Sequence, residues 1–122
     1  MMRTLRTDQR FRKRERIGKR DDFARVYAAK CSAGDELMVV YAAANELPYT
    51  RIGISVSRKV GIAVRRSYVR RRIREAFRLN KEQIPKGVDL ICLAKGPAGD
   101  KKFDVARSLI RLSARAAKRC GK

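Results

Sequence analysis

The sequence predicts a single α+β domain in which three helices pack on a small mixed sheet of four strands, in the order αβββαβα. Three kinds of observation predict this class: alternating apolar and polar residues that suit strands, apolar residues three and four apart that suit helices, and glycine or proline between them. The chain has 122 residues, of which 44% are hydrophobic, so it has room for one domain with one modest core. Helices and strands mixed along the chain in this way favour helices packed against a single sheet.

The N-terminal region is predicted to contain a basic arm followed by a short helix. Residues 1–18 are rich in Lys and Arg, and we expect them to form a flexible arm before a folded domain at 19–122. Between residues 19 and 29, two aspartates suit a helix start, and the apolar residues that follow recur three and four apart. We therefore expect the first helix there.

Two or three strands are expected between the first helix and the second. Alternating apolar residues predict one strand from Glu36 to Ala44, with a turn at Gly34 before it and a break at Pro48 after it. Residues 51–57 show the clearest alternation in the chain. Its two sides are Ile52, Ile54 and Val56 on one, and Arg51, Gly53, Ser55 and Ser57 on the other. We expect this strand to be buried on one face only.

The second half of the chain predicts a helix, a strand and a final helix. Residues 62–79 suit a helix that ends at Asn80, and 88–95 suit a strand that is apolar on both faces and therefore central in its sheet. Asp100 is placed to cap the last helix. The expected apolar stripes are Ile62, Val69, Ile73, Ala76 and Phe77 on the middle helix, and Ala106, Leu109, Ile110, Ser113 and Ala117 on the last.

The strongest functional signal is the charge of the chain. It has 32 Lys and Arg against 12 Asp and Glu, a net charge of +20, and such a surface attracts a polyanion. Arginine predominates among the basic residues, and its planar guanidinium can grip phosphate with two hydrogen bonds and stack on bases. We therefore expect a nucleic acid as partner, in preference to an acidic protein or an anionic membrane.

The sequence predicts no metal site, bound cofactor or membrane segment. Cys31, Cys92 and Cys120 are odd in number and widely separated, and the chain has no histidine, so we expect reduced thiols and neither a disulfide framework nor a zinc site. Cys92 lies in an apolar run and should pack as a small hydrophobic residue. The N-terminus lacks the apolar core of a secretory signal, and no apolar run approaches the roughly 20 residues that span a bilayer. A cytoplasmic location is expected.

One face of the middle helix is predicted to be a basic ridge. It comprises Ser67, Arg70, Arg71, Arg74 and Arg78. These residues share a face about 100° wide at about 100° per residue. A charge run is often only a solvated helix face, but here the sign is nearly uniform, and like charges four residues apart cost a few tenths of a kcal/mol per pair. Neutralisation by a phosphate backbone would offset that cost, so we favour RNA binding.

The middle helix and the residues before it carry the signature of a known family. The residues concerned are Ser57-Arg58-Lys59-Val60-Gly61-Ile62-Ala63-Val64, then Arg66, Arg70-Arg71 and Arg74-Glu75-Ala76-Phe77. They resemble the signature of the bacterial ribonuclease P protein subunit, and the likeness extends to the first helix, to the strand at 51–57 and, more faintly, to the last helix. The family's Arg-Asn-Arg triplet is matched only at Arg66, because Ser67 and Tyr68 replace its other two residues.

The resemblance implies a fold and two RNA surfaces. The fold is that of ribosomal protein S5 domain 2, in which a strand, the basic helix and the next strand are joined by a left-handed crossover. One surface docks on a catalytic RNA, and the other, on the opposite side of the domain, is a cleft that holds the 5′ leader of precursor tRNA. The residues implied for the catalytic RNA are Arg58, Lys59, Arg66, Ser67, Arg70, Arg71 and Arg74, and those for the leader cleft are Phe23, Tyr27, Tyr41, Arg51, Ser55 and Ser57.

Three aromatic residues are the main candidates for leader binding. Phe23 and Tyr27 lie one turn apart on the first helix, and Tyr41 can face them from the next strand. Aromatic side chains beside basic residues stack on unpaired bases, which contributes roughly 1–3 kcal/mol per base. The alternative is that the three are ordinary core residues. Arg51, on the polar side of its strand, is a further candidate, for contact with leader phosphates or sugars.

We assign no catalytic residue to the polypeptide. RNA hydrolysis needs an acid and a base that titrate near neutral pH, or a metal-activated water, and the chain has no histidine and no compact carboxylate cluster in its sequence. The resemblance implies that the RNA subunit binds Mg²⁺ and cleaves precursor tRNA endonucleolytically. For the complex itself we expect one protein monomer bound to one RNA. The main alternative is a ribosomal or other rRNA-binding structural protein. A DNA-binding architectural protein would also suit the charge, but the sequence shows no recognition helix or dimer seam.

Overall fold

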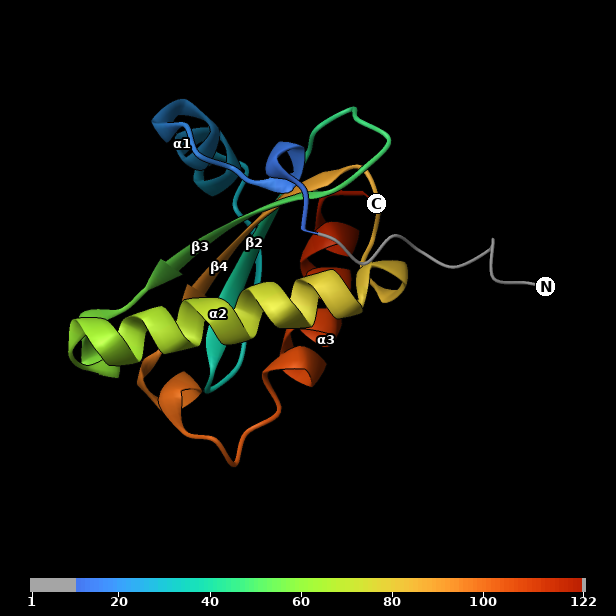
Figure 1. Cartoon of the computed structure of the whole chain (residues 1–122). Coiled ribbons are helices and arrows are strands. Elements are labelled where there is room, and N and C mark those ends of the chain that lie inside the picture. The colour runs from blue at the N-terminus through green and yellow to red at the C-terminus, as the bar shows by residue number, and fades with distance from the viewer. Residues whose placement is uncertain (1–10, 122) are drawn as a thin grey trace.

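The fold is a four-stranded mixed sheet with helices on both faces, seen in a computed structural model that describes residues 11–121 (Figure 1). The strands are β1 (Cys31–Gly34), β2 (Met38–Ala44), β3 (Arg51–Val56) and β4 (Val88–Ala94), and the helices are α1 (Arg20–Ala28), α2 (Ala63–Leu79) and α3 (Val105–Arg119). The order in the sheet is β1-β2-β4-β3. Strand β4 pairs antiparallel with β2 and parallel with β3. The predicted α+β class and the order αβββαβα are confirmed.

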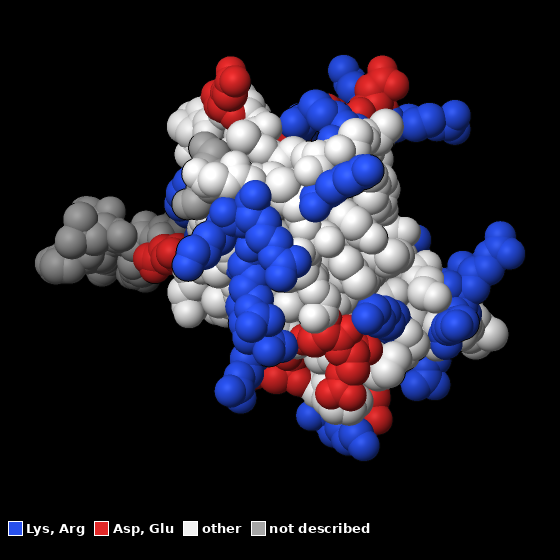
Figure 2. All heavy atoms as spheres, turned by 180° about the vertical axis from the view of Figure 1, so that it is seen from behind, with Lys and Arg blue, Asp and Glu red and all other residues white. Residues whose placement is uncertain are grey.

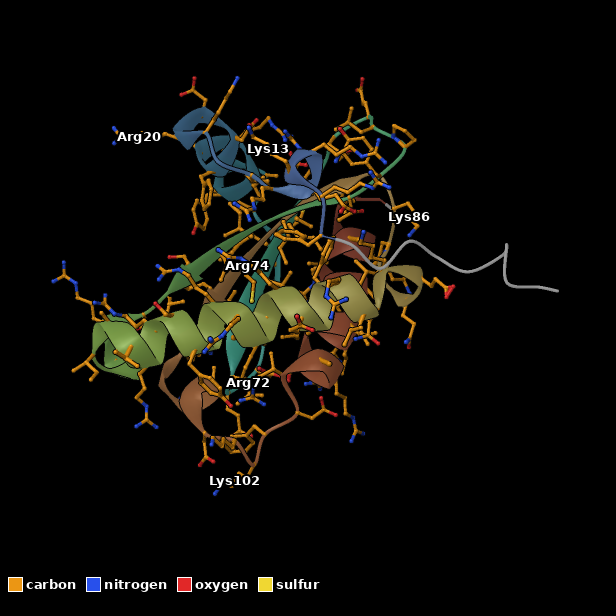
Figure 3. All side chains as sticks on the ribbon, viewed as in Figure 1. Lys13, Arg20, Arg72, Arg74, Lys86 and Lys102 are labelled. Carbon is orange, nitrogen blue, oxygen red and sulfur yellow. A yellow bond between two sulfur atoms is a disulfide. The ribbon has the colours of Figure 1, made fainter. Side chains whose placement is uncertain are left out.

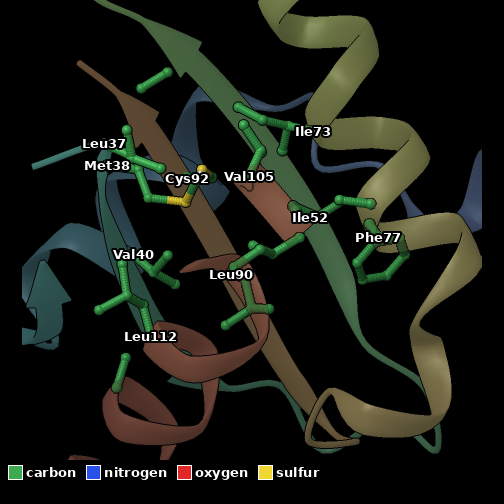
Figure 4. Close-up of a cluster of buried hydrophobic side chains, with 14 of the residues drawn as sticks. Leu37, Met38, Val40, Ile52, Ile73, Phe77, Leu90, Cys92, Val105 and Leu112 are labelled. Carbon is green, nitrogen blue, oxygen red and sulfur yellow. Dashed lines mark hydrogen bonds between the residues drawn. The ribbon is translucent and has the colours of Figure 1, made fainter. Parts of the chain in front are cut away.

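The main core lies between one face of the sheet and the two longer helices (Figure 4). Val40 of β2 and Leu90 of β4 are fully buried there, against Ile73 of α2 and Leu112 of α3. The opposite face meets only α1 and the segment before it, which form a smaller cluster around Val26. Strand β3 is buried toward the helices, as its alternation predicts, and β3, α2 and β4 form the parallel unit for which the resemblance implies a left-handed crossover.

The strands and helices for which bounds were predicted agree with the observed ones within two residues, except at the start of α3, which begins four residues later than expected. Ile62 precedes α2 and is 73% exposed, so its expected place in the buried stripe is wrong. The cap of α3 is Asp104, whose carboxylate accepts the Arg107 N–H at 3.1 Å, and not Asp100. The buried stripe of α3 is also rotated relative to the expected one. The residues buried on α3 are Val105, Ser108, Leu109, Leu112, Ser113, Ala116 and Ala117, while Ala106 and Ile110 are only partly buried.

The described part of the predicted N-terminal arm packs on the domain. The Phe11 ring meets the Phe77 ring of α2 edge-on, with centroids 5.8 Å apart. Glu15 is buried and pairs with the buried Lys81 at 2.9 Å. The packed part of the chain therefore begins before residue 19, and the arm's first ten residues lie outside the described part. The flexibility expected of the arm stays a prediction.

The cysteines differ from the expected reduced state. Cys31 in β1 and Cys120 at the end of α3 are joined by a disulfide, with their Cα atoms 5.6 Å apart. The prediction of reduced thiols was wrong for this pair because their wide separation in sequence concealed their proximity in the fold. Cys92 packs as expected: it is fully buried beside Met38, and burial raises the pKa of its thiol to about 12. In residues 11–121, no helix has the length and apolar character that a membrane span requires.

Candidate RNA interface

The side of the sheet away from α2 and α3 is only partly covered. Helix α1 packs over one end of it, and the remainder forms a floor of neighbouring side chains from three strands. Across this floor, Val39 of β2 is paired with Leu93 of β4, which is paired with Ser55 of β3. All three are half-buried. The result is a partly apolar, accessible surface beside α1, the helix that carries the leader-cleft candidates Phe23 and Tyr27.

The three aromatic candidates lie together at the covered end of this floor. The Tyr27 and Tyr41 rings meet edge-to-face, with centroids 4.8 Å apart. Tyr27 remains 37% exposed, and burial of its hydroxyl, followed by the influence of Tyr41, raises its pKa. Phe23 is half-buried and packs directly on Gly53, where an added Cβ would lie 2.7 Å from the ring. Gly53 therefore allows the Phe23 ring to approach the strand closely.

Arg51 is engaged in a buried ion-pair network at the same end. Asp89 of β4 is fully buried, and its two carboxylate oxygens accept hydrogen bonds from Arg51 Nε at 2.8 Å and Nη2 at 2.5 Å. Arg25 of α1 also donates to Asp89, and Asn45 donates to it at 2.9 Å. The hydrogen bond to Asp89 raises the pKa of Arg51. In this arrangement Arg51 helps to fix α1 to the sheet.

Sequence reasoning missed the role of Asp89, although a signal was available. Asp89 is the only carboxylate in the predicted central strand at 88–95. A buried charge is tolerated only when it is paired and hydrogen-bonded. An acid in such a strand therefore indicates cationic partners elsewhere in the chain, and Arg25 and Arg51 fill that role.

Helix α2 contributes to both predicted RNA surfaces. Arg70 and Arg74 line a groove of about 250 Å³ together with Phe23 and Gly53, and Figure 3 shows Arg74 on the side of α2 that faces the sheet and α1. We expected the two surfaces to lie on opposite sides of the domain. Instead they meet along this groove, because α2 packs over β3 at the edge of the sheet.

The basic ridge is exposed and cationic. Arg71 and Arg74 are exposed and Arg70 is partly so, and within the described chain none of the three forms a salt bridge. Arg78 pairs with Glu75 at 2.5 Å. These three arginines can therefore contact an anionic partner without first breaking an intramolecular salt bridge.

The turn before α2 is shaped by its own residues. Ser57 accepts a hydrogen bond from the Lys59 N–H at 3.1 Å, which caps a short helical turn that leaves Arg58 and Lys59 exposed. Gly61 follows with φ of 128°, a conformation that side-chain-bearing residues rarely adopt. Ser57 thus shapes the turn that presents the two basic residues beside the start of α2.

The other flank of α2 faces α3. Arg72 donates to the carbonyl oxygens of Ala98, Asp100 and Phe103, at 3.2, 3.2 and 2.7 Å, and Figure 3 shows it on the side of the helix away from Arg74. Tyr68 lies beside it in a hollow of about 470 Å³ between the two helices. This hollow also contains two carboxylates, so it suits a phosphate chain less well than the groove near Phe23. Among residues 11–121, no three Cys, Asp or Glu side chains come together in a group that could hold a metal ion.

Comparisons with known proteins agree with this geometry. Residues 11–117 match the family model described as Ribonuclease P. The Ribonuclease P protein component of Clostridioides difficile is 39% identical over 104 residues, which cover 84% of this chain and 91% of that protein. The RNase P protein structure from Staphylococcus aureus has a TM-score of 0.73 at 39% identity and covers 85% of this chain and 95% of that one. The Thermotoga maritima RNase P protein gives a TM-score of 0.74 at 36% identity, covering 83% and 96%.

Proposed function

The chain belongs to the ribonuclease P protein family, and from this premise we propose that its basic helix and its open sheet face act side by side on RNA. It is a protein component of ribonuclease P and serves in the removal of the 5′ leader from precursor tRNA. The family match does not favour the ribosomal alternative. The observation that carries the proposal is the groove in which Arg70 and Arg74 stand beside Phe23.

Helix α2 and the turn before it bind the ribonuclease P RNA in this proposal. The exposed guanidinium groups of Arg71 and Arg74 supply phosphate contacts, which release counterions and make the affinity dependent on salt. Arg66 is half-buried, and its Nε is buried without a hydrogen-bond partner in the described chain, so the guanidinium must turn outward to meet a phosphate or base acceptor. The full set is Arg58, Lys59, Arg66, Ser67, Arg70, Arg71 and Arg74.

The open face binds the leader of precursor tRNA. Tyr27 and Tyr41 offer ring surface to unpaired bases, and Phe23 forms the wall between them and α2. Ser55 lies on the floor of the sheet. Arg51 and Ser57 remain in the candidate set, but because Asp89 holds Arg51 and the turn uses Ser57, we assign them mainly to shaping the cleft.

The chemistry is assigned to the RNA subunit and its Mg²⁺. The chain has no histidine, and the Cys92 thiol is fully buried, with its pKa raised to about 12. The chain therefore has no imidazole, and the Cys92 thiol does not exchange protons near neutral pH. The protein instead supplies cations that offset the repulsion between the two RNAs. We further propose a cytoplasmic complex of one protein and one RNA.

The first experiment tests helix α2. The protein is combined with a bacterial ribonuclease P RNA, and the affinity is measured over a range of salt concentrations. Replacing Arg70 and Arg74 by Gln should flatten the salt dependence by roughly 0.7–0.9 slope units per lost phosphate contact. The matched control replaces Lys101 and Lys102, two exposed lysines of the loop before α3, and should leave the slope nearly unchanged. An unchanged slope in the α2 variant would remove this helix from the interface.

The second experiment tests the cleft. Tyr27→Ala should weaken binding of precursor tRNA by the reconstituted complex, and it should leave binding of mature tRNA unchanged because the leader is absent. Tyr49→Ala is the control, since Tyr49 lies under Arg14 outside the aromatic cluster. Equal losses for precursor and mature tRNA would contradict a leader-binding role. Low Mg²⁺ makes the protein's contribution to cleavage easiest to observe, and a protein that fails to stimulate cleavage there would contradict the proposed function itself.

A further inference from the structure

Helix α3 carries a second row of cations that the function proposed above does not use. Arg107, Arg111, Arg115 and Lys118 are all exposed. At about 100° per residue, they fall within about 80° of one another around the helix axis. Figure 2 shows a band of Lys and Arg on the side of the molecule that is hidden in Figure 1. We call these four residues the α3 row.

Most of the α3 row is available for a partner. Arg111 pairs with Asp35 at 2.7 Å, and Asp35 also accepts hydrogen bonds from the Ser108 hydroxyl and two backbone N–H groups. In residues 11–121, Arg107, Arg115 and Lys118 form no salt bridge. Arginines four residues apart on a helix repel one another, so this row lowers helix stability unless an anion neutralises it.

The α3 row is held rigidly. Leu109 and Leu112 on the opposite side of the helix are fully buried in the main core. At the end of the helix, the disulfide between Cys31 and Cys120 joins it to β1, and the Arg119 guanidinium donates to the Ser32 carbonyl of the same strand. A helix held in this way loses little backbone conformational entropy on binding. From Arg107 to Lys118 the row spans about 16 Å at 1.5 Å per residue.

The position of the row indicates which RNA it meets. Helices α2 and α3 lie on the same face of the sheet, while the open face lies on the other. Helix α2 packs against β3 at one edge of the sheet, and α3 packs against β1 and β2 toward the other edge. One straight RNA segment cannot contact both, and the leader lies elsewhere in the proposed function. We propose that the α3 row binds the phosphate backbone of a second segment of the ribonuclease P RNA, an inference that rests on the proposed function.

The test compares pairs of charge-removing substitutions in the full-length protein. Arg115→Gln with Lys118→Gln removes two cations of the row that form no salt bridge, and Lys101→Gln with Lys102→Gln removes two exposed cations outside it. The α3 pair should flatten the salt dependence of binding to ribonuclease P RNA by about 1.4–1.8 slope units. If the variant and the wild type bind equally at about 1 M salt, where the electrostatic contribution is small, the variant should bind roughly 25-fold to 60-fold more weakly at about 0.1 M salt. The control pair should change little.

Each outcome decides the proposal. An unchanged slope for the α3 pair, or an equal change in the control pair, overturns it, while a loss for the Arg70 and Arg74 variant in the same assay leaves the proposed function standing. A loss confined to precursor tRNA binding by the assembled complex would also overturn it, because the partner would then be the tRNA. Absence of RNA binding by the wild-type protein would refute the proposed function and this inference together. Circular dichroism and thermal unfolding of the α3 pair should match the wild type, since both side chains are exposed.

Discussion

Replacing Gly53 by Ala tests whether the position of the Phe23 ring controls leader binding. Gly53 lies on β3 beneath this ring, and an added Cβ would stand 2.7 Å from Cζ and 3.1 Å from Cε1 of Phe23. The Ile17 Cβ would lie 3.3 Å away. Since real Cβ contacts are essentially never shorter than 3.0 Å, the ring must move outward, and Ile17 restricts movement on its own side.

Two effects follow. Overpacking of this kind costs about 1–3 kcal/mol of folding stability. The displaced ring also loses part of a stacking contact worth about 1–3 kcal/mol per base, which predicts precursor tRNA binding weaker by up to roughly 100-fold at 1.4 kcal/mol per factor of ten. Affinity for the ribonuclease P RNA should change much less, because the exposed arginines of α2 keep their positions.

The assay measures unfolding free energy and both RNA affinities for Gly53→Ala, Phe23→Leu and the double variant. Leucine is smaller and lacks the ring carbons nearest position 53, so the double variant should recover stability relative to Gly53→Ala. Contacting residues typically couple by about 0.5–3 kcal/mol. Additive changes in stability would show that the ring does not meet position 53. A leader affinity equal to that of the wild type in Gly53→Ala would refute the link between ring position and leader binding.

Three further changes test the supporting structure. Asp35→Asn should cost about 1 kcal/mol of folding stability at pH 7, because charged hydrogen bonds stabilise the folded state. Burial opposes ionisation of Asp35, but the Ser108 hydroxyl, the backbone N–H groups and Arg111 together lower its pKa. The stabilisation by Asp35 is therefore present above the unfolded pKa of about 3.9, and urea unfolding should show that it is lost as the pH falls through the lower folded pKa. Reducing the disulfide, which links residues 89 positions apart, should lower the unfolding temperature by removing up to about 4–5 kcal/mol, and Cys31→Ser should abolish sensitivity to reductant. Arg72→Met should cost about 2–3 kcal/mol in chemical unfolding through three lost hydrogen bonds, while the salt dependence of RNA binding stays within one slope unit of the wild type.

The secondary structure could be predicted where one local pattern dominates. The alternation at 51–57 and the apolar stripe around Ile73 are each set by burial of one side, and both elements appear as expected. Strand β1 had no such pattern, because it is short, lies at the sheet edge and is recognised only by its pairing with β2. The α3 cap went to Asp104 because residues 96–99 already form a helical turn that ends at Asp100.

The functional residues could be predicted by type more readily than by partner. Phe23, Tyr27 and Tyr41 come together because helical spacing and strand alternation each predict a side chain's direction. The pairing of Arg51 with Asp89, like that of the two bridged cysteines, depends on which strands become neighbours. Local patterns carry no information about that choice. The sequence therefore predicted Arg51 as a leader contact, whereas in the structure its guanidinium binds the Asp89 carboxylate of the same protein.

The engagement of Arg51 changes where the positive charge of the cleft must originate. Its guanidinium is held by a fully buried carboxylate. Pulling it away would break two charge-assisted hydrogen bonds, each worth about 1.5–3 kcal/mol, and would leave Asp89 with only Arg25 and Asn45 as partners. A phosphate on the surface cannot offset that cost, because solvent-exposed ion pairs contribute about 0–1 kcal/mol. The cations that line the groove beside Phe23 are instead Arg16, Arg70 and Arg74, and two of these belong to the helix proposed to hold the ribonuclease P RNA. Binding of the leader and binding of the RNA subunit are therefore supported by the same short stretch of α2, and substitutions at Arg70 or Arg74 should affect both, whereas substitutions at Tyr27 should affect only the leader.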